Sequence, residues 1–184
     1  MNEEPTIIKQ TRCWVKSVIV EHNFCPFARR ELERDSIRYS INHDTDLEPA
    51  LQAVIDECVY LNENDATETT LLVFAEGFKD FGDYLDLVEL AQDLLADQGY
   101  EGIYQIASFH PDYCFADAEL DDAANYTNRS PYPMLHLIRE ASMEKALAHY
   151  PEPEKIPERN VEYARELGLE EMQRQLEACC KIEK

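Results

Sequence analysis

The sequence predicts an α/β fold, in which helices cover a small, mostly parallel sheet of three strands or slightly more, with a helical extension at the C-terminus. Three short apolar segments, at residues 36–41, 69–75 and 103–109, have the length and composition of strands. Segments with the 3.6-residue repeat of amphipathic helices separate them. Strands that alternate with helices indicate βαβ units with right-handed crossovers. The alternative is an α+β sheet in which one strand is antiparallel.

The N-terminal part is predicted to be helical. Within residues 6–22 the apolar side chains recur at helical spacing around Trp14. Pro26 follows Cys25, and a proline is typical of the first turn of a helix, so we expect a second, short helix that reaches about Arg34. The next segment, SIRYSI at residues 36–41, alternates in polarity as a strand does.

The middle of the chain repeats this alternation twice. Residues 47–61 and 81–98 have helical periodicity, and Gly99 is placed where a helix C-cap residue is expected. Residues 69–75 (TTLLVFA) form a continuous apolar run, which is typical of a buried strand. Residues 103–109 predict the third strand.

A long loop rich in His, Asp, Asn and Arg follows the third strand. Ser130 is a typical N-cap residue and Pro131 and Pro133 fit a first helical turn, so a helix to about His149 is predicted. The proline-rich segment at residues 151–157 connects it to further helices, which Gly168 interrupts. We expect one α/β domain over residues 1–184, with the connector and helices of residues 151–184 packed on it.

The composition restricts the class of partner. The net charge of −21 argues against nucleic acids and anionic membrane surfaces, which need a basic patch. No apolar run reaches the length of a membrane span, and the acidic N-terminus does not resemble a signal peptide. We therefore expect an acidic cytoplasmic protein with six reduced cysteines, and the absence of a Cys-x-x-Cys pair indicates neither a zinc ribbon nor a dithiol motif.

Cys25 is the first candidate for chemistry. We expect it at the cap of a helix that carries Arg29 and Arg30, and both a helix N-terminus and nearby cations favour the thiolate. This arrangement predicts a reactive cysteine. The alternative is a capping thiol packed between Phe24 and Phe27.

His110 is the second candidate, because it ends the third strand, where ligands usually bind in α/β folds. It could act as a general base, bind a metal or anchor the loop. In an extended chain His110, Asp112 and Cys114 would share one side, although a structural zinc site needs a fourth ligand. The acidic residues that follow are typical of a solvated face, and their spacing does not match an EF-hand loop.

A possible anion site precedes the predicted helix at residue 130. Amides and a guanidinium at a helix N-terminus suit an anion, which makes Asn128 and Arg129 candidate binding residues, with closure of a turn by the Asn side chain as the alternative. On the predicted helix, His136 and Glu140 would be one turn apart, with Arg139 on the flank. Such a pair forms either a local salt bridge or part of the crevice at His110.

Six motifs spread along the chain together resemble one family. They are Trp14, NFCPFA at residues 23–28, TLLVF at 70–74, FHP at 109–111, NRSPYPMLHLIRE at 128–140 and IPERN at 156–160. This combination spans nearly the whole chain and is similar to the bacterial and plastid family named domain of unknown function 1415. The resemblance implies no activity, since none is established for that family.

Three hypotheses for the function remain. The first is an enzyme that acts on a small anionic metabolite, with Cys25 as nucleophile, His110 as base, and a set of binding residues comprising Asn128, Arg129, Arg139, His136 and Glu140. The second is a metal-dependent enzyme or metal-binding protein that uses His110 and His136. The third is a non-enzymatic, acidic module that binds a protein partner through its C-terminal helices. The sequence identifies no cofactor.

Overall fold

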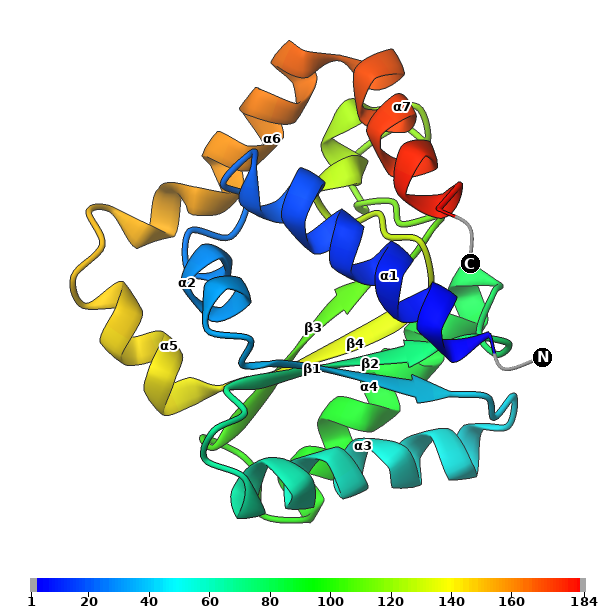
Figure 1. Ribbon diagram of the computed structural model, residues 1–184, viewed down its shortest axis with the longest axis vertical. Coiled ribbons are helices and arrows are strands. Elements are labelled where there is room, and N and C mark those ends of the chain that lie inside the picture. Colours follow the sequence, from blue (N-terminus) through cyan, green and yellow to red (C-terminus); the bar gives the residue numbers. More distant parts are fainter. Residues whose placement is uncertain (1–2, 183–184) are drawn as a thin grey trace.

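A mixed sheet of four strands forms the centre of the protein (Figure 1). The computed structural model describes residues 3–182, and in it the strand order is β1-β2-β4-β3. The strands β1 and β2 are parallel, and β4 is antiparallel to both of its neighbours. The bounds are Ile37–Asn42 (β1), Thr69–Phe74 (β2), Tyr104–Phe109 (β3) and Met134–Arg139 (β4). The α/β class is confirmed. The expected mostly parallel sheet of three strands is not what forms, because the antiparallel strand of the alternative lies at the centre of the four strands and makes two of the three pairings.

Two helices cover one face of the sheet. Helix α3 (Leu47–Glu63) connects β1 to β2, and α4 (Phe81–Asp97) connects β2 to β3. Asp80 caps α4 by accepting the backbone N–H groups of Gly82 and Asp83. The apolar sides of both helices pack on alternate residues of the sheet, among them Leu72, Phe74, Leu135 and Leu137.

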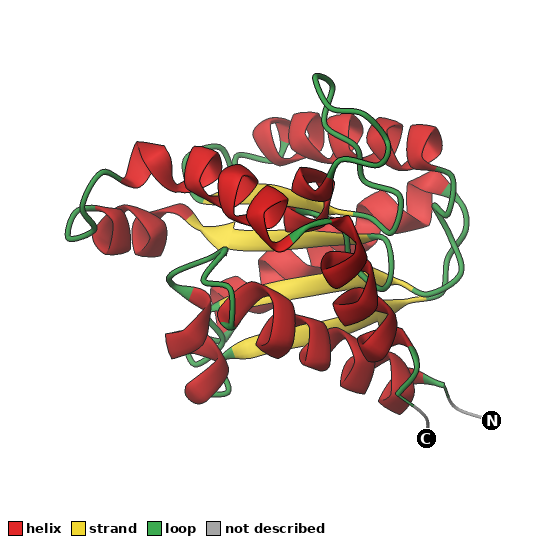
Figure 2. Cartoon of the chain, turned by 90° about the horizontal axis from the view of Figure 1, so that it is seen from above, coloured by secondary structure: helices red, strands yellow, loops and turns green. Residues whose placement is uncertain are grey.

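The N-terminal and C-terminal helices cover the other face (Figure 2). Figure 2 views the protein from the face on which these helices lie, and in it they lie across the strands. Their core is built around Trp14, with Leu71 of β2 and Met134 of β4 from the sheet. The elements are α1 (Glu4–Trp14), the π-helical turn η1 (Val15–Val20), α2 (Ala28–Glu33), α5 (Glu140–Leu147), α6 (Ile156–Leu167) and α7 (Leu169–Cys180), with short 3-10 turns η2 (Ala123–Thr127) and η3 (Pro153–Lys155).

Most predicted elements are confirmed within a few residues. The three predicted strands correspond to β1, β2 and β3, and the predicted helices at residues 47–61 and 81–98 correspond to α3 and α4. The predicted N-terminal helix is present, although a π-helical turn forms its second half. Gly168, with a φ of +86°, separates α6 from α7, where the sequence predicted an interruption.

The helix predicted from residue 130 to 149 is wrong in its first half. Met134–Arg139 is the strand β4, and the helix α5 starts only at Glu140. A short apolar run fits a buried strand and a buried helix equally well, and periodicity alone does not separate them. β4 is paired along both edges, with β2 and β3, and helices pack on both faces of the sheet. Its sequence MLHLIR therefore lacks the alternation of a half-exposed strand.

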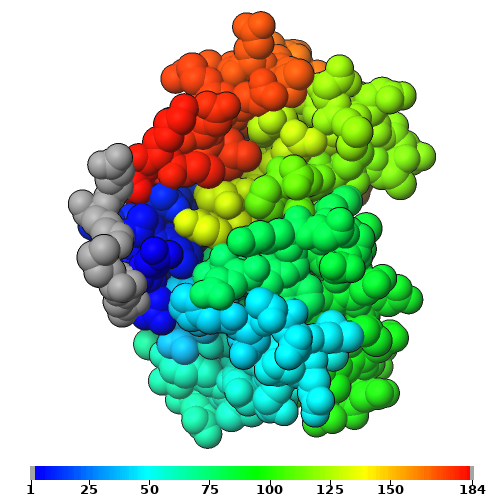
Figure 3. All heavy atoms as spheres, turned by 90° about the vertical axis from the view of Figure 1, so that its right-hand side faces the viewer, coloured from blue at the N-terminus to red at the C-terminus, as the bar shows by residue number. Residues whose placement is uncertain are grey.

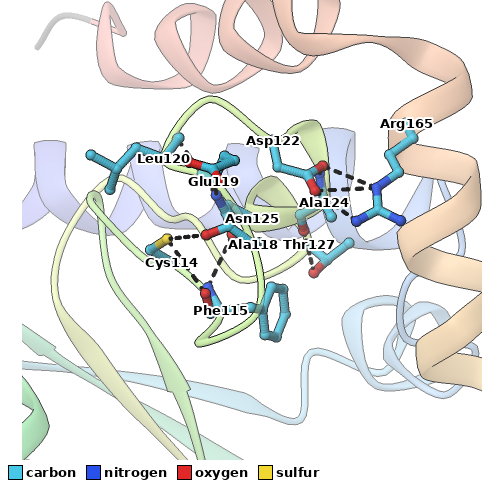
Figure 4. A network of polar contacts seen from close by, with 10 residues as sticks. All are labelled: Cys114, Phe115, Ala118, Glu119, Leu120, Asp122, Ala124, Asn125, Thr127 and Arg165. Carbon is cyan, nitrogen blue, oxygen red and sulfur yellow. Dashed lines mark hydrogen bonds and ion pairs between the residues drawn. The ribbon is translucent and has the colours of Figure 1, made fainter.

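Buried polar groups order the loop at residues 110–133 (Figure 4). Asn125 is fully buried, accepts the backbone N–H of Phe115 at 3.0 Å, and donates to the carbonyl oxygen of Glu119 at 2.8 Å. Asp122 forms an ion pair of 2.6 Å with Arg165 of α6. The loop is therefore fixed internally and also tied to the C-terminal helices.

In the part of the chain that the structure describes, no helix is both long enough and apolar enough to cross a membrane.

Candidate functional site

A cavity of about 570 Å³ lies between the sheet and the N-terminal layer of helices. This volume is typical of a site for a small organic molecule, and the walls are mainly apolar. The aromatic rings of Trp14, Phe27 and Phe109 line it, together with Leu71 and Met143. The helices α2 and α5 contribute one side, and residues of all four strands form the floor.

The position of the cavity differs from the expected one. Ile37 and Thr69, which line it, are the first residues of β1 and β2. The sequence directed attention to the carboxyl ends of the parallel strands, where ligands usually bind and where His110 lies. The cavity instead lies over the first half of β1 and β2, and it reaches the carboxyl end of a parallel strand only at Phe109 of β3.

His136 lies on the floor of this cavity. Its Nε2 is 2.7 Å from the hydroxyl oxygen of Thr69, and the Thr69 hydroxyl donates to the carbonyl oxygen of Leu137. Burial lowers the pKa of His136 to about 4, because the surrounding protein disfavours the charged ring. The side chain is therefore a neutral imidazole at neutral pH.

Cys25 lines the same cavity from the loop before α2. Burial raises the pKa of its thiol, and hydrogen bonds from the backbone of Phe27 and Ala28 oppose this shift without cancelling it. The low pKa that the sequence suggested is therefore not what the local environment favours. Cys25 is a neutral thiol in a half-buried, mainly apolar position.

The NFCPFA loop is held by the IPERN segment of α6. Asn160 donates to the carbonyl oxygen of Phe24 at 2.7 Å, and Arg159 donates to that of Asn23 at 2.7 Å. Asn23 has a φ of +55°, a left-handed conformation that asparagine tolerates better than most residues. Two motifs far apart in the sequence thus position Cys25 together.

The charged groups of the cavity differ in balance from those of the whole protein. Arg30, Arg34 and Lys145 line it with Glu31 and Glu68, which gives a net charge of +1. The complete chain has 17 basic and 38 acidic residues. Glu31 lies 3.7 Å from Arg30 and 3.5 Å from Arg34, so the acidic group is shared between two guanidinium groups. The charged groups at the cavity thus have the opposite net sign to the chain as a whole, which suits an anion.

Glu68 carries one polar atom that nothing in the described chain satisfies. Its Oε1 is buried and has no hydrogen-bond partner within residues 3–182. A buried acceptor without a donor is costly. A ligand that donates a hydrogen bond at this point would remove that cost.

His110 does not lie in this cavity. It is fully buried on the opposite face of the sheet, where its ring contacts those of Phe81 and Tyr84 of α4 at 5.1 and 4.9 Å. Its Nδ1 accepts the backbone N–H of Asp112 at 3.0 Å, and its Nε2 lies 3.0 Å from the carbonyl oxygen of Phe78. Both ring nitrogens are thus used to fix two loops, and the structure does not bring His110 into the cavity of Cys25.

Asn128 and Arg129 also have internal partners. Asn128 donates to the carbonyl oxygen of Ser108 at 3.1 Å. Arg129 donates to the carbonyl oxygens of Tyr113 and Leu120 at 3.0 and 2.9 Å. The expected helix N-terminus after them is absent, since β4 follows. These side chains hold the loop in place.

Arg139 and Glu140 are at the junction of β4 and α5. Arg139 donates to the carbonyl oxygen of Leu61 at 2.5 Å and to that of Thr67 at 3.1 Å, which satisfies the last turn of α3. Glu140 begins α5, and its backbone N–H donates to the carbonyl oxygen of Ile103. Neither residue lines the cavity, so His136 alone of the expected binding residues does so.

Sequence reasoning missed Thr69, Glu68, Arg34 and Lys145. Thr69 could have been noticed, because a hydroxyl that starts a buried apolar run needs a partner. Arg34 and Lys145 gave no signal, since a charge on or at the end of an amphipathic helix usually faces solvent. Glu68 lies in the connection before β2, where a charged side chain is also usually exposed.

The two histidines of the metal hypothesis face opposite sides of the sheet. In the described part of the chain, no group of three His, Cys, Asp or Glu side chains is arranged to hold a metal ion.

Comparisons with known proteins give one match. No curated protein and no solved structure in the comparison matches the chain. The family described as "Protein of unknown function (DUF1415)" matches residues 6–174, which include all six motifs and every cavity residue named above. The match covers nearly the whole chain, and the protein therefore belongs to this family.

Proposed function

We propose that the protein is an enzyme that binds a small organic anion with a largely apolar body in the cavity, with Cys25 and His136 as its reactive side chains. The observation that carries this proposal is the presence of both side chains in one apolar cavity of about 570 Å³. Cys25 keeps the role of nucleophile that its motif suggested. His136 replaces His110 as the base, because it lines the cavity.

The charged groups define the ligand further. Arg30, Arg34 and Lys145 would bind its anionic group, and the apolar walls its body. Oε1 of Glu68 would accept a hydrogen bond from a hydroxyl, amide or amine of the ligand. A small carboxylate or phosphate monoester with an apolar part and one such donor fits these requirements.

The protonation states constrain the chemistry. Both side chains are neutral at rest, so the protein does not maintain a thiolate–imidazolium pair. In the proposed step Sγ of Cys25 adds to the carbon of a carbonyl group that the ligand carries, and the π electrons of that C=O bond move to its oxygen. The thiol proton passes to Nδ1 of His136, which returns it to this oxygen. Proton transfer and attack would occur together.

The same neutrality favours a second candidate, a binding protein without chemistry. A thiol with a raised pKa is a weak nucleophile. Under this candidate Cys25 is a wall of the cavity, and the ligand is released unchanged.

Fluorescence of Trp14 tests binding, because Trp14 lines the cavity and is the only tryptophan of the chain. The probes are short-chain and aromatic carboxylates and phosphate monoesters. We expect a saturable change with at least one of these classes. Ala146→Phe, which fills the cavity from α5, should abolish it, and Ala141→Phe on the exposed side of α5 should not. A fluorescence change in Ala146→Phe as large as that in the wild type would contradict the proposal.

A matched pair of variants tests the charge of the cavity. Arg34→Gln should weaken binding of the anion several-fold, whereas Arg29→Gln, which removes the same charge from α2 outside the cavity, should have little effect. Equal weakening of anion binding in the two variants would indicate that only the overall charge of the protein attracts the anion.

Turnover separates the two candidates. With a ligand found by fluorescence, Cys25→Ser should bind but form no adduct or product, as measured by mass spectrometry. Cys114→Ser is the control, because Cys114 is also half-buried but lies outside the cavity. Binding without adduct or product in the wild type would favour the binding protein.

A further inference from the structure

The two ends of the described chain lie side by side. Helix α7 packs against α1, and Figures 1 and 3 both show the C-terminal segment (red) beside the N-terminal one (blue). Gln10 of α1 donates to the carbonyl oxygens of Cys180 and Ile182 at 2.7 and 3.0 Å. These bonds satisfy carbonyl groups at the end of α7, where the helix itself offers no donors.

Two thiols meet at this contact. Sγ of Cys13 in α1 lies 3.1 Å from Sγ of Cys179 in α7, although 166 residues separate them in the sequence. Cys179 is buried and Cys13 is half-buried. A disulfide bond is about 2.05 Å long, so its formation requires the sulfurs to approach by roughly 1 Å. Within residues 3–182, no other two cysteine sulfurs are recorded in contact.

We propose that Cys13 and Cys179 are an oxidation site, at which a peroxide closes a disulfide bond between α1 and α7. Hydrogen peroxide first converts the half-buried thiol of Cys13 to a sulfenic acid and releases one water molecule. The sulfur of Cys179 then attacks the sulfenic sulfur, the S–O bond breaks, and a second water molecule leaves with the thiol proton. Two thiols are oxidised and one peroxide is reduced.

The arrangement distinguishes Cys179 from its neighbour. Of the two adjacent cysteines Cys179 and Cys180, Cys180 is the exposed one, yet Cys179 makes the contact with Cys13. The hydroxyl of Ser17 lies 3.3 Å from Sγ of Cys179 and 3.7 Å from Sγ of Cys13. The three polar atoms form one small cluster between the helices. Cys180 is therefore the natural control residue for this site.

The bond would enclose almost the whole described chain in one loop. A cross-link over a long loop restricts the unfolded chain more than the folded one. For a protein of this size we expect the oxidised form to melt about 5–15 °C higher than the reduced form.

Peptide mapping without reductant tests the site. The reduced protein is treated with hydrogen peroxide while folded, its remaining thiols are alkylated, and trypsin is added. Trypsin places Cys13 in the peptide of residues 13–16 and Cys179 in that of residues 175–181. We expect these two peptides to be recovered joined, with the loss of two hydrogen atoms.

Serine variants assign the bond. Cys180→Ser should keep the joined peptide and the rise in melting temperature, whereas Cys13→Ser and Cys179→Ser should lose both. A joined peptide that persists in Cys179→Ser would overturn the assignment. Full recovery of the alkylated peptide 13–16 from peroxide-treated wild type or Cys180→Ser would overturn the proposal. The measurements on wild type and on Cys180→Ser do not depend on whether the Cys179→Ser protein folds.

Discussion

The hydroxyl group of Thr69 determines which nitrogen of His136 carries the proton. Because Thr69 donates its own hydrogen to the carbonyl oxygen of Leu137, its oxygen accepts from Nε2 of His136 at 2.7 Å. In the neutral ring the lone pair is then on Nδ1. No hydrogen bond to this atom is recorded in residues 3–182, so it is the position from which a base would act.

The pKa of His136 makes the stability of the protein depend on pH. The folded ring takes up a proton at about pH 4, against an ordinary value of 6.5. Between these values the unfolded state binds more protons, so stability is full above pH 6.5, falls as the pH decreases to 4, and levels off below. At about 1.4 kcal/mol per pH unit over the roughly 2.5 units between these values, the loss is about 3–4 kcal/mol.

His136→Gln tests this dependence. The glutamine amide can still donate to Thr69 but does not titrate, so urea unfolding between pH 7 and pH 4 should show a smaller loss of stability than in wild type. His110, whose pKa burial also lowers, contributes to the loss in both proteins. His149→Gln, at an exposed position, serves as the control. Equal pH dependence in wild type and His136→Gln would contradict the lowered pKa.

Arg139 should matter for stability and not for ligand binding. Arg139→Gln removes its hydrogen bonds to the carbonyl oxygens of Leu61 and Thr67, and we expect a loss of about 2–4 kcal/mol in the free energy of unfolding. Arg30→Gln, at a largely exposed side chain, should change it by less than about 0.5 kcal/mol. Chemical denaturation measures both. A stable Arg139→Gln that fails to bind ligand would restore Arg139 as an anion anchor.

Gly77 is required by the backbone around it. A Cβ atom there would lie 2.5 Å from the carbonyl oxygen of Asp44, and a backbone atom cannot move away cheaply. We expect Gly77→Ala to destabilise the protein by about 1–3 kcal/mol. At Gly82 the nearest atom is a side-chain oxygen of Asp80 at 3.1 Å, so Gly82→Ala should have a much smaller effect. Similar melting temperatures for the two variants would exclude this steric cause.

His110→Ala distinguishes a loop anchor from a base. The variant leaves the backbone N–H of Asp112 and the carbonyl oxygen of Phe78 without partners, which should cost about 2–4 kcal/mol. The alkylation rate of Cys25 in the folded protein should stay unchanged, because His110 lies outside its cavity. Mass spectrometry of the labelled peptide measures this rate. A large decrease, in a protein that remains folded, would return His110 to the site.

Local sequence patterns were sufficient for most of the fold. The βαβ units follow from apolar runs such as residues 69–75 and from helical repeats on either side of them. The strand β4 was missed because Pro131 and Pro133 resemble a helix start and because MLHLIR has no alternation. Only its pairing between β2 and β3 makes these residues a strand, and this pairing is not a local property.

The site was less accessible to sequence reasoning. Cys25 was found, since its motif is local. His110 and His136 were both noticed, but their faces of the sheet depend on strand register, and one residue of difference moves a side chain to the other face. The expected anion residues Arg129 and Arg139 bind backbone carbonyl groups. An arginine that completes a helix end and one that binds a ligand look identical in a sequence.

The central position of β4 has a consequence for synthesis on the ribosome. Strands β2 and β3 are both complete by residue 109, but each pairs with β4, which ends at residue 139. Until that segment has left the exit tunnel, β3 has no neighbour in the sheet and β2 keeps one edge open. Unpaired edges are prone to association with other chains. A chain arrested between residues 109 and 139 should therefore be a good client for chaperones that protect exposed strands.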